Sequence, residues 1–209
     1  MKVFLDHAST TPVRQSSIDA LVSALADTGN PQSVHAHGQA TRALLEDARD
    51  ELAKAAGCNR SEVIFNSGGT EANNQAIKGI FWARNQDKTR NVIITAATEH
   101  HALLEPVTWL CEHEKAQLEL VAVQPNGEID LGSLKNLIST FGDDIALISL
   151  MWVNNETGVI TDIPEVCKIA SGIPVHSDAV AAFGHVPLNF AASGLTAMSI
   201  SGHKIGAPI

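Results

Sequence analysis

Short apolar runs alternate along this chain with longer stretches in which apolar residues recur at helical spacing. The runs are rich in Val, Ile and Leu, and most lack the apolar–polar alternation of a half-exposed strand. Strands that are buried on both faces of a sheet have this composition. We therefore predict strands at Glu62–Asn66, Asn91–Thr95, Leu118–Val123, Ile145–Met151, Ile173–His176 and Met198–Ser201.

The stretches between these runs carry signals that begin and end helices. Gly57 is a typical stop, Asp130 a typical N-cap, and Pro164 suits a first turn. Strands and helices that alternate in this way predict an α/β fold, a mostly parallel sheet flanked by helices, with ligands beyond the carboxyl ends of the strands. The predicted helices are Gly38–Ala56, Thr70–Asn85, Asp130–Thr140 and Pro164–Ala170.

Composition excludes several classes of partner. The formal net charge of −9 and the 4% of aromatic residues argue against a nucleic-acid-binding surface. No run approaches the roughly 18 apolar residues of a membrane span, and Asp6 comes too early for a signal peptide. Cys58, Cys111 and Cys167 are widely separated, so they form neither a disulfide framework nor a metal motif. We expect a cytoplasmic protein with no nucleic-acid or membrane partner.

Ser67–Asn74 follows the first predicted strand and opens a predicted helix. Gly68 and Gly69 allow a backbone to approach a ligand closely, the helix N-terminus offers free N–H groups, and Thr70 adds a hydroxyl donor. The segment is not a P-loop, because no Gly-Lys-Ser/Thr sequence follows. It indicates either a cradle for a phosphate group or a plain turn between strand and helix.

Two further strand ends carry His100 and Asn155. His100 suits an acid/base or a flat ring for stacking, with an exposed His-His pair as the alternative. We predict no zinc site there, because adjacent histidines point in different directions and no third ligand lies nearby. Asn155 belongs to an Asn-Asn-Glu-Thr-Gly sequence that forms turns readily and also offers neutral donors to a carboxylate or phenolate oxygen.

Asp178 and Lys204 complete the candidate chemistry. Asp178 lies among apolar residues at a strand end, so it needs a partner such as a protonated pyridine nitrogen, unless it only caps a helix. Lys204 lies in a Ser-Gly-His-Lys sequence just beyond the last predicted strand, where an amine that loses its proton can form a Schiff base. A phosphate cradle, a stacking ring, a neutral donor, an aspartate and a lysine together match pyridoxal 5'-phosphate (PLP), which we predict as the cofactor.

The motifs, in this order, resemble the cysteine desulfurases of the NifS/IscS type within the class V aminotransferases. The resemblance covers essentially the whole chain and implies the fold of the large domain of fold-type I PLP-dependent transferases. The matching segments are Phe4–Pro12, Gly29–His35, Phe65–Glu71, Thr98–His100, Asn154–Gly158, His176–Val180 and Ser201–Lys204.

The resemblance implies a role for each matching residue. Lys204 bonds the cofactor's aldehyde and moves the substrate's α-proton, while His100 stacks on the ring and assists proton transfer. Asp178 pairs with the ring nitrogen, and Asn155 lies near the phenolate oxygen and the substrate carboxylate. The phosphate is held by Gly69, Thr70, Ser201 and His203.

The same resemblance implies an enzyme that converts L-cysteine to L-alanine and a persulfide on an enzyme cysteine. The sulfur passes to an acceptor or scaffold protein for iron–sulfur cluster or thio-cofactor synthesis, and the full-length form is expected to be a homodimer. The alternatives are a selenocysteine lyase or another class V β-lyase, and a non-catalytic fragment that acts as a partner-binding module.

The chain departs from the family pattern at its end and near the aspartate. Ala181 replaces a usual Gln, which predicts a weaker hold on the ring, and Ala207 replaces a usual Gly. The family continues beyond position 209, so the small C-terminal domain and the nucleophilic cysteine are expected outside this chain, and no cysteine here lies at the nucleophile's position. We expect residues 1–15 to pack with that small domain and residues 16–209 to form the PLP-binding large domain, incomplete at its C-terminus.

Overall fold

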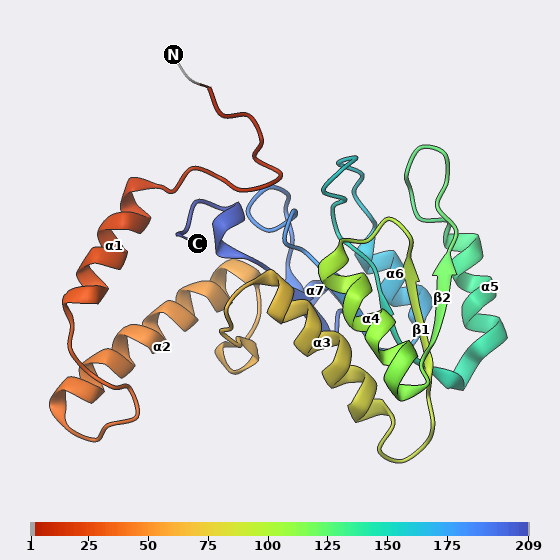
Figure 1. Ribbon diagram of the computed structural model, residues 1–209, viewed down its shortest axis with the longest axis horizontal. Coiled ribbons are helices and arrows are strands. Elements are labelled where there is room, and N and C mark those ends of the chain that lie inside the picture. Colours follow the sequence, from red (N-terminus) through yellow and green to blue (C-terminus); the bar gives the residue numbers. More distant parts are fainter. Residues whose placement is uncertain (1–2, 209) are drawn as a thin grey trace. The chain divides into compact units, whose positions relative to one another are not determined.

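A computed structural model describes residues 3–208, which form two compact units. The first unit contains the residues up to Phe65 together with the segment from Gly202, and the second is Asn66–Ser201. In Figure 1 the ribbon is coloured along the sequence, from red at the N-terminus to blue at the C-terminus. None of the helices in the described part of the chain combines the length and the apolar character that crossing a membrane requires. The predicted boundary after residue 15 stays a prediction.

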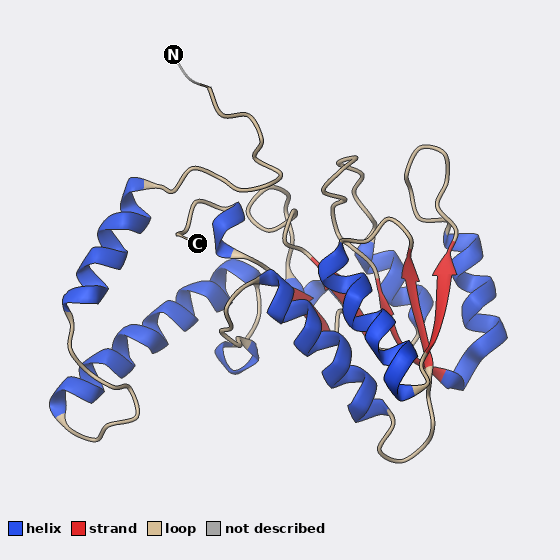
Figure 2. Ribbon diagram, in the orientation of Figure 1, coloured by secondary structure: helices blue, strands red, loops and turns tan. Residues whose placement is uncertain are grey.

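The second unit is built on a five-stranded sheet in which each strand runs parallel to its neighbours. Figure 2 shows the strands in red among the helices. The sheet confirms the predicted parallel α/β fold, and five of the predicted runs supply its strands with small shifts at their ends. In the spatial order β2-β1-β3-β4-β5, the strands are β1 (Val92–Ala96), β2 (Gln117–Val121), β3 (Ile145–Ser149), β4 (Val175–Asp178) and β5 (Ala197–Ser199).

Helices cover both faces of this sheet (Figure 1). On the face under α3 and α4, Ile77 and Leu103 pack with Ile93 in one apolar cluster. On the opposite face, Leu134 of α5 and Val166 of α6 belong to a second cluster that includes several other strand residues. The helices of this unit are α3 (Gly69–Arg84), α4 (His101–Glu114), α5 (Leu131–Phe141), α6 (Ile163–Ala170) and the short α7 (Phe190–Ser193).

Several helix ends lie where the sequence predicts them. In the first unit, α2 (Ala36–Ala56) stops at Gly57, whose φ of 71° is in the left-handed region that glycine adopts readily. Asp130 caps α5 by accepting hydrogen bonds from the N–H groups of Gly132 and Ser133. Pro164 lies in the first turn of α6, where its missing N–H removes no helical hydrogen bond.

The strand predicted at Glu62–Asn66 is wrong. A 3₁₀ turn occupies Arg60–Glu62, and the following Ile64 and Phe65 are 68% and 46% exposed. Arg49 of α2 donates a hydrogen bond to a backbone carbonyl of this segment, and its guanidinium lies 5.0 Å from the Phe65 ring centroid. The run therefore contacts α2 through the Arg49 side chain, whereas a strand would need a neighbouring strand to pair with its backbone.

The helix α1 (Gln15–Ala26) is not among the predicted helices, although its apolar residues recur at helical spacing. The N-cap, Arg14, makes no capping hydrogen bond through its side chain, so the usual start signal is missing. No residue of this helix is buried among the described residues. The exposed apolar side chains of α1 are Ile18, Leu21, Val22 and Leu25.

Candidate active site

The predicted site residues of the second unit lie at the end of the sheet where the strands have their carboxyl ends. Because the strands are parallel, all of their carboxyl ends lie at this end of the sheet. Asp178 ends β4 there, and the segments that follow β1, β3 and β5 carry His100, Asn155 and Ser201. The order of the strands reverses between β1 and β3, since β2 lies on one side of β1 and the later strands lie on the other. Ligands bind open α/β sheets at such a switch point.

Two hydrogen bonds tie together the segments that leave β1 and β3 at this switch point. The N–H of Met151 donates to Oε1 of Glu99 over 2.8 Å. The Asn154 side-chain amide donates to the carbonyl of Thr98 over 2.9 Å. The two loops beside the predicted ring site are thereby held to each other.

The start of α3 lies close to Ser201. A Cβ added to Gly69 would lie 2.9 Å from a methyl group of Val180 and 3.4 Å from Cβ of Ser201. Glycine therefore allows the start of this helix to lie this close to Val180 and Ser201. The first N–H groups of a helix have no intrahelical acceptors, and Thr70 is exposed in the same turn. Gly69, Thr70 and Ser201 thus bring together backbone and hydroxyl donors that suit an anion.

Asp178 ends β4 with only 4% of its surface exposed. Its Oδ1 accepts a hydrogen bond from the N–H of Val180 over 2.9 Å, and its Oδ2 accepts one from Nδ2 of Asn73 over 2.6 Å. These donors are neutral, so they stabilise the carboxylate without cancelling its charge. A buried carboxylate of this kind can attract a cationic ring nitrogen.

Glu99 is a second buried carboxyl group at the carboxyl end of the sheet, and the sequence reasoning assigned it no role. Burial raises its pKa, the hydrogen bond from Met151 lowers it and the charge of Asp178 raises it, and together they bring it to about 8. Its second oxygen, Oε2, is buried without a hydrogen-bond partner among the described residues. At neutral pH Glu99 therefore holds a proton.

His176 lies within β4, fully buried, and links three strands. Its Nδ1 lies 2.8 Å from Oγ of Ser149 on β3, and its Nε2 lies 2.9 Å from Oγ of Ser199 on β5. Burial lowers its pKa to about 3, so the ring is neutral at physiological pH. Because side chains two residues apart share a face of a strand, this polar bridge lies on the face that carries Asp178.

His100 begins α4 as its N-cap. Its Nδ1 accepts a hydrogen bond from the N–H of Ala102 over 3.0 Å, so a neutral ring carries its proton on Nε2. The residue is exposed, with the ring centroid 6.4 Å from that of His101. The cap hydrogen bond holds the imidazole at the start of α4, beyond the end of β1.

Asn154 and Asn155 have different tasks in the loop after β3. Oδ1 of Asn154 accepts hydrogen bonds from the N–H of Glu156 and from the N–H and hydroxyl of Thr157, while its amide binds Thr98. Asn155 makes a 3.2 Å contact with the exposed Glu156. Asn154 builds the turn, which leaves Asn155 as the amide available to a ligand.

Separate alanine substitutions distinguish these two tasks. We expect Asn154→Ala to lower the free energy of unfolding by about 1–3 kcal/mol, because several hydrogen bonds lose their shared partner. Asn155→Ala should change it by less than about 0.5 kcal/mol. Chemical denaturation of both variants measures the difference, and equal losses would show that Asn154 is not the structural residue.

Lys204 and His203 belong to the first unit, where they contact the N-terminal segment. The Lys204 ammonium donates to the carbonyl groups of Ala8 and Ser9, the latter over 2.9 Å. Nδ1 of His203 lies 3.1 Å from Oγ1 of Thr10. Burial, and then the charge of Lys204, lowers the pKa of His203. These contacts hold the Lys204 side chain against the N-terminal segment.

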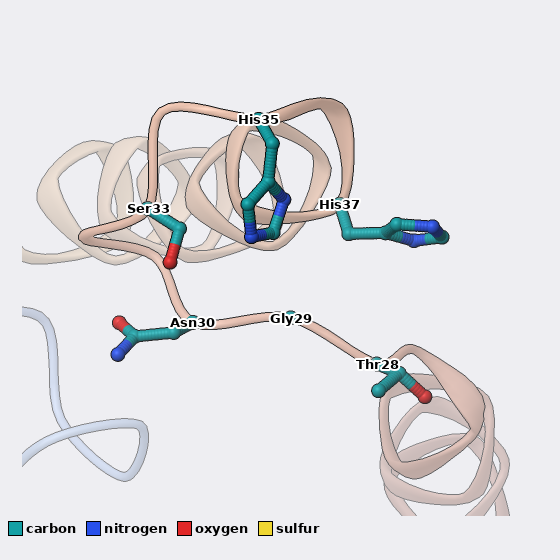
Figure 3. Close-up of a pocket in the computed structure, with 6 residues that line it drawn as sticks. All are labelled: Thr28, Gly29, Asn30, Ser33, His35 and His37. Carbon is teal, nitrogen blue, oxygen red and sulfur yellow. The ribbon is translucent and has the colours of Figure 1, made fainter.

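A pocket of about 510 Å³ lies in the first unit, where the predicted Gly29–His35 motif meets α2. Figure 3 shows the His35 ring turned toward the Gly29–Asn30 backbone and the His37 ring turned away from it. A Cβ on Gly29 would lie 2.4 Å from the carbonyl oxygen of His37, so a larger residue at position 29 would disrupt this wall of the pocket. Within residues 3–208 no three His, Cys, Asp or Glu side chains gather as a metal site. The lining residues are Thr28, Gly29, Asn30, Ser33, His35 and His37.

Comparison with known proteins decides the family. The model of the class-V aminotransferase family matches residues 3–209. The chain belongs to this family. This confirms the resemblance on which the site residues were chosen.

Proteins similar to this class-V chain include cysteine desulfurases. An IscS-like cysteine desulfurase of Mycobacterium tuberculosis is 44% identical over 98% of this chain and 53% of its own length. The structure of a NifS-like protein has a TM-score of 0.93 at 30% identity, over 100% of this chain and 57% of that one. The structure of SspA in complex with cysteine has a TM-score of 0.91 at 26% identity, over 99% and 59%. The chain thus spans a little over half the length of these proteins.

The cysteines of this class-V chain are poor nucleophiles. Burial raises the pKa of Cys58, Cys111 and Cys167, the last to about 11. A raised pKa keeps a thiol protonated at neutral pH, whereas attack on sulfur needs a thiolate. The geometry therefore agrees with the expectation that none of them is the catalytic thiol.

Sequence reasoning missed Asn73, Glu99 and His176 as parts of the site. Each lies inside a motif, but its partners are distant in the sequence, so no local pattern shows them. One signal was available: Asn73 shares a four-residue spacing with Ile77 and Phe81, the other buried residues of α3. A polar residue in a buried stripe needs a specific partner, which would have marked Asn73.

Proposed function

We propose that this chain is the PLP-binding part of a cysteine desulfurase. The observation that carries the proposal is Asp178, a buried carboxylate held by neutral donors at the carboxyl end of β4. The family membership of the chain, its IscS-like relative and the cysteine bound by SspA support L-cysteine as substrate and L-alanine as product.

The side chains of the second unit fit the chemical groups of PLP. The helix start at Gly69, with the Thr70 and Ser201 hydroxyls, suits the dianionic phosphate. Asp178 suits a protonated ring nitrogen, and the neutral Glu99 does not add a competing charge beside it. When bound, the cofactor would supply an electron sink for carbanion chemistry at the substrate's α-carbon.

The remaining residues are assigned to orientation and proton transfer. His100 would stack on the ring and exchange a proton through Nε2, because Nδ1 is occupied by the cap. Asn155 would donate to the phenolate oxygen and the substrate carboxylate, and His203 would contact the phosphate. Lys204 would be the amine that binds the cofactor and moves the α-proton, which requires it to leave the carbonyl groups of the N-terminal segment and lose a proton.

The proposal that all these residues serve one cofactor rests on family membership, because Lys204 and His203 belong to a different unit from the others. We further propose that residues 1–15 pack with a small domain, that the full-length enzyme is a homodimer, and that sulfur leaves it as a persulfide for an acceptor or scaffold protein. The length of the similar proteins supports a nucleophilic cysteine outside these residues.

Addition of PLP to the purified protein tests the proposal. We expect a visible absorption band that survives gel filtration and is abolished in Lys204→Ala, because the covalent bond to the cofactor's aldehyde needs the Lys204 amine. Lys168→Ala, which replaces an exposed lysine paired with Glu165, is the control and should keep the band. A wild-type protein without the band, or an unchanged band in Lys204→Ala, would refute the assignment and favour a non-catalytic, partner-binding role.

A further inference from the structure

Asn73 occupies a position that hydrophobic patterning would reserve for an apolar residue. It is fully buried, and the next buried residues of α3, Ile77 and Phe81, follow at intervals of four. This spacing places the three side chains on one face of the helix, toward the sheet. A buried amide without hydrogen bonds is costly, so a reason is needed for an asparagine here.

The reason lies on β4, more than a hundred residues away in the sequence. Nδ2 of Asn73 lies 2.6 Å from Oδ2 of Asp178, a short distance typical of a hydrogen bond to a charged acceptor. The amide can only donate to a carboxylate, so this contact also sets the orientation of the Asn73 side chain, with Oδ1 on the other side. Oδ1 itself is buried without a partner among the described residues. The contact with Asp178 is therefore retained even though half of the amide is left unsatisfied.

The choice of an amide has an electrostatic consequence. An arginine or lysine at this position would hold Asp178 more strongly but would neutralise it. A neutral donor lowers the energy of the carboxylate and adds no positive charge of its own. With the N–H of Val180 on Oδ1, the amide also leaves Asp178 little freedom to rotate.

We propose that Asn73 is a positioning residue for Asp178: it fixes the carboxylate in one orientation and keeps it ionised for a cationic ligand atom. For PLP that atom is the ring nitrogen, and this part of the inference rests on the proposed function. Asn73 itself touches no reacting atom in this role. It sets how much of the bound ring carries a proton on its nitrogen.

The first test uses the cofactor-free protein. We expect the ¹³Cγ signal of Asp178 to titrate at a midpoint at least about one pH unit higher in Asn73→Ala than in the wild type, because the carboxylate loses a donor. Asn73→Leu is the second variant, since a side chain of similar size keeps the buried stripe filled. Asn74→Ala makes the same change at the neighbouring, partly exposed position and should leave the midpoint in place.

Other titrating groups near Asp178 are separated by their own variants. Glu99 beyond β1 and His176 on β4 are the ionisable side chains placed near it by the contacts given above, and Glu99→Gln and His176→Gln remove their titrations. In the wild type, the side-chain amide signals of Asn73 should shift with the same midpoint as Asp178. This last measurement needs no variant, so the inference is tested even if both substitutions at position 73 unfold the protein.

The second test uses the PLP-bound protein and ¹⁵N-labelled cofactor. We expect the ring-nitrogen signal of Asn73→Leu to move toward the unprotonated value and PLP to bind about tenfold more weakly, with Asn74→Ala unchanged. An Asp178 midpoint and a ring-nitrogen signal that do not respond to Asn73 would overturn the inference. A wild-type protein that takes up no PLP would refute the proposed function alone, because the titration of Asp178 would still show whether Asn73 controls it.

Discussion

Glu99→Gln should make the protein more stable at alkaline pH by several kcal/mol. Glutamine has the shape of protonated glutamate, so it keeps an oxygen for the N–H of Met151 and a donor where the acid carries its proton. The wild-type carboxyl must instead take up a proton to fold, because burial raises its pKa from 4.5 to about 8. The substitution removes that requirement.

The pH dependence of this effect follows from linkage. Below pH 4.5 the carboxyl is protonated in both the folded and the unfolded chain and costs nothing. Between 4.5 and about 8 only the unfolded chain loses the proton, so the wild type loses about 1.4 kcal/mol of stability per pH unit. Above about pH 8 the loss is complete. The advantage of Glu99→Gln should therefore be absent near pH 4 and largest above pH 8.

Urea unfolding between pH 4 and pH 9 measures this difference. The buried Trp152, which follows the Met151 that binds Glu99, gives a fluorescence signal from the second unit. Glu105→Gln, on the exposed side of α4, removes the same charge and should follow the wild type. If Glu99→Gln and the wild type lose stability in parallel up to pH 9, the carboxyl is ionised in the folded protein and its assignment as the neutral partner of Asp178 is wrong.

His176→Gln should remove a loss of stability that the wild type suffers as the pH falls. Burial lowers the pKa of His176 from 6.5 to about 3, so the folded chain keeps the ring neutral while the unfolded chain gains a proton. Stability is therefore complete above pH 6.5 and falls by about 1.4 kcal/mol per unit as the pH drops toward 3. Glutamine does not titrate, and we expect its slope over this range to be smaller by that amount.

The His176 substitution carries a constant cost that the pH profile separates from titration. Glutamine is not the shape of imidazole, so one of the bonds to Ser149 and Ser199 is lost, at about 1–3 kcal/mol at every pH. The curve for His176→Gln should lie below that of the wild type near pH 7 and approach it as the pH falls. The control is His185→Gln, which changes an exposed histidine. Parallel curves for His176→Gln and the wild type would mean that the buried ring is charged or that water reaches it.

The amino-acid sequence was sufficient for the local features. The apolar runs predicted the strands of the sheet, and Gly57 and Asp130 marked helix ends, because these depend on the conformation and hydrogen bonding of a few adjacent residues. The parallel order followed from strand–helix alternation. Asp178 and Asn155 could be selected because their motifs lie where such strands end. The failure at Glu62–Asn66 has the complementary cause: the run is apolar, but a strand also needs a partner strand, which no local pattern can specify.

The tertiary structure alone decided which groups surround those residues and in which protonation state. Asn73 meets Asp178, Glu99 meets Met151, and His176 meets Ser199 through contacts between segments that lie far apart in the chain. A pKa depends on burial and on the nearest charges, and both are set by packing. The sequence by itself thus determined the fold class and indicated the strand-end residues that are proposed for the site. Only the folded chain determined that Glu99 and His176 are neutral and that Asn73 meets Asp178.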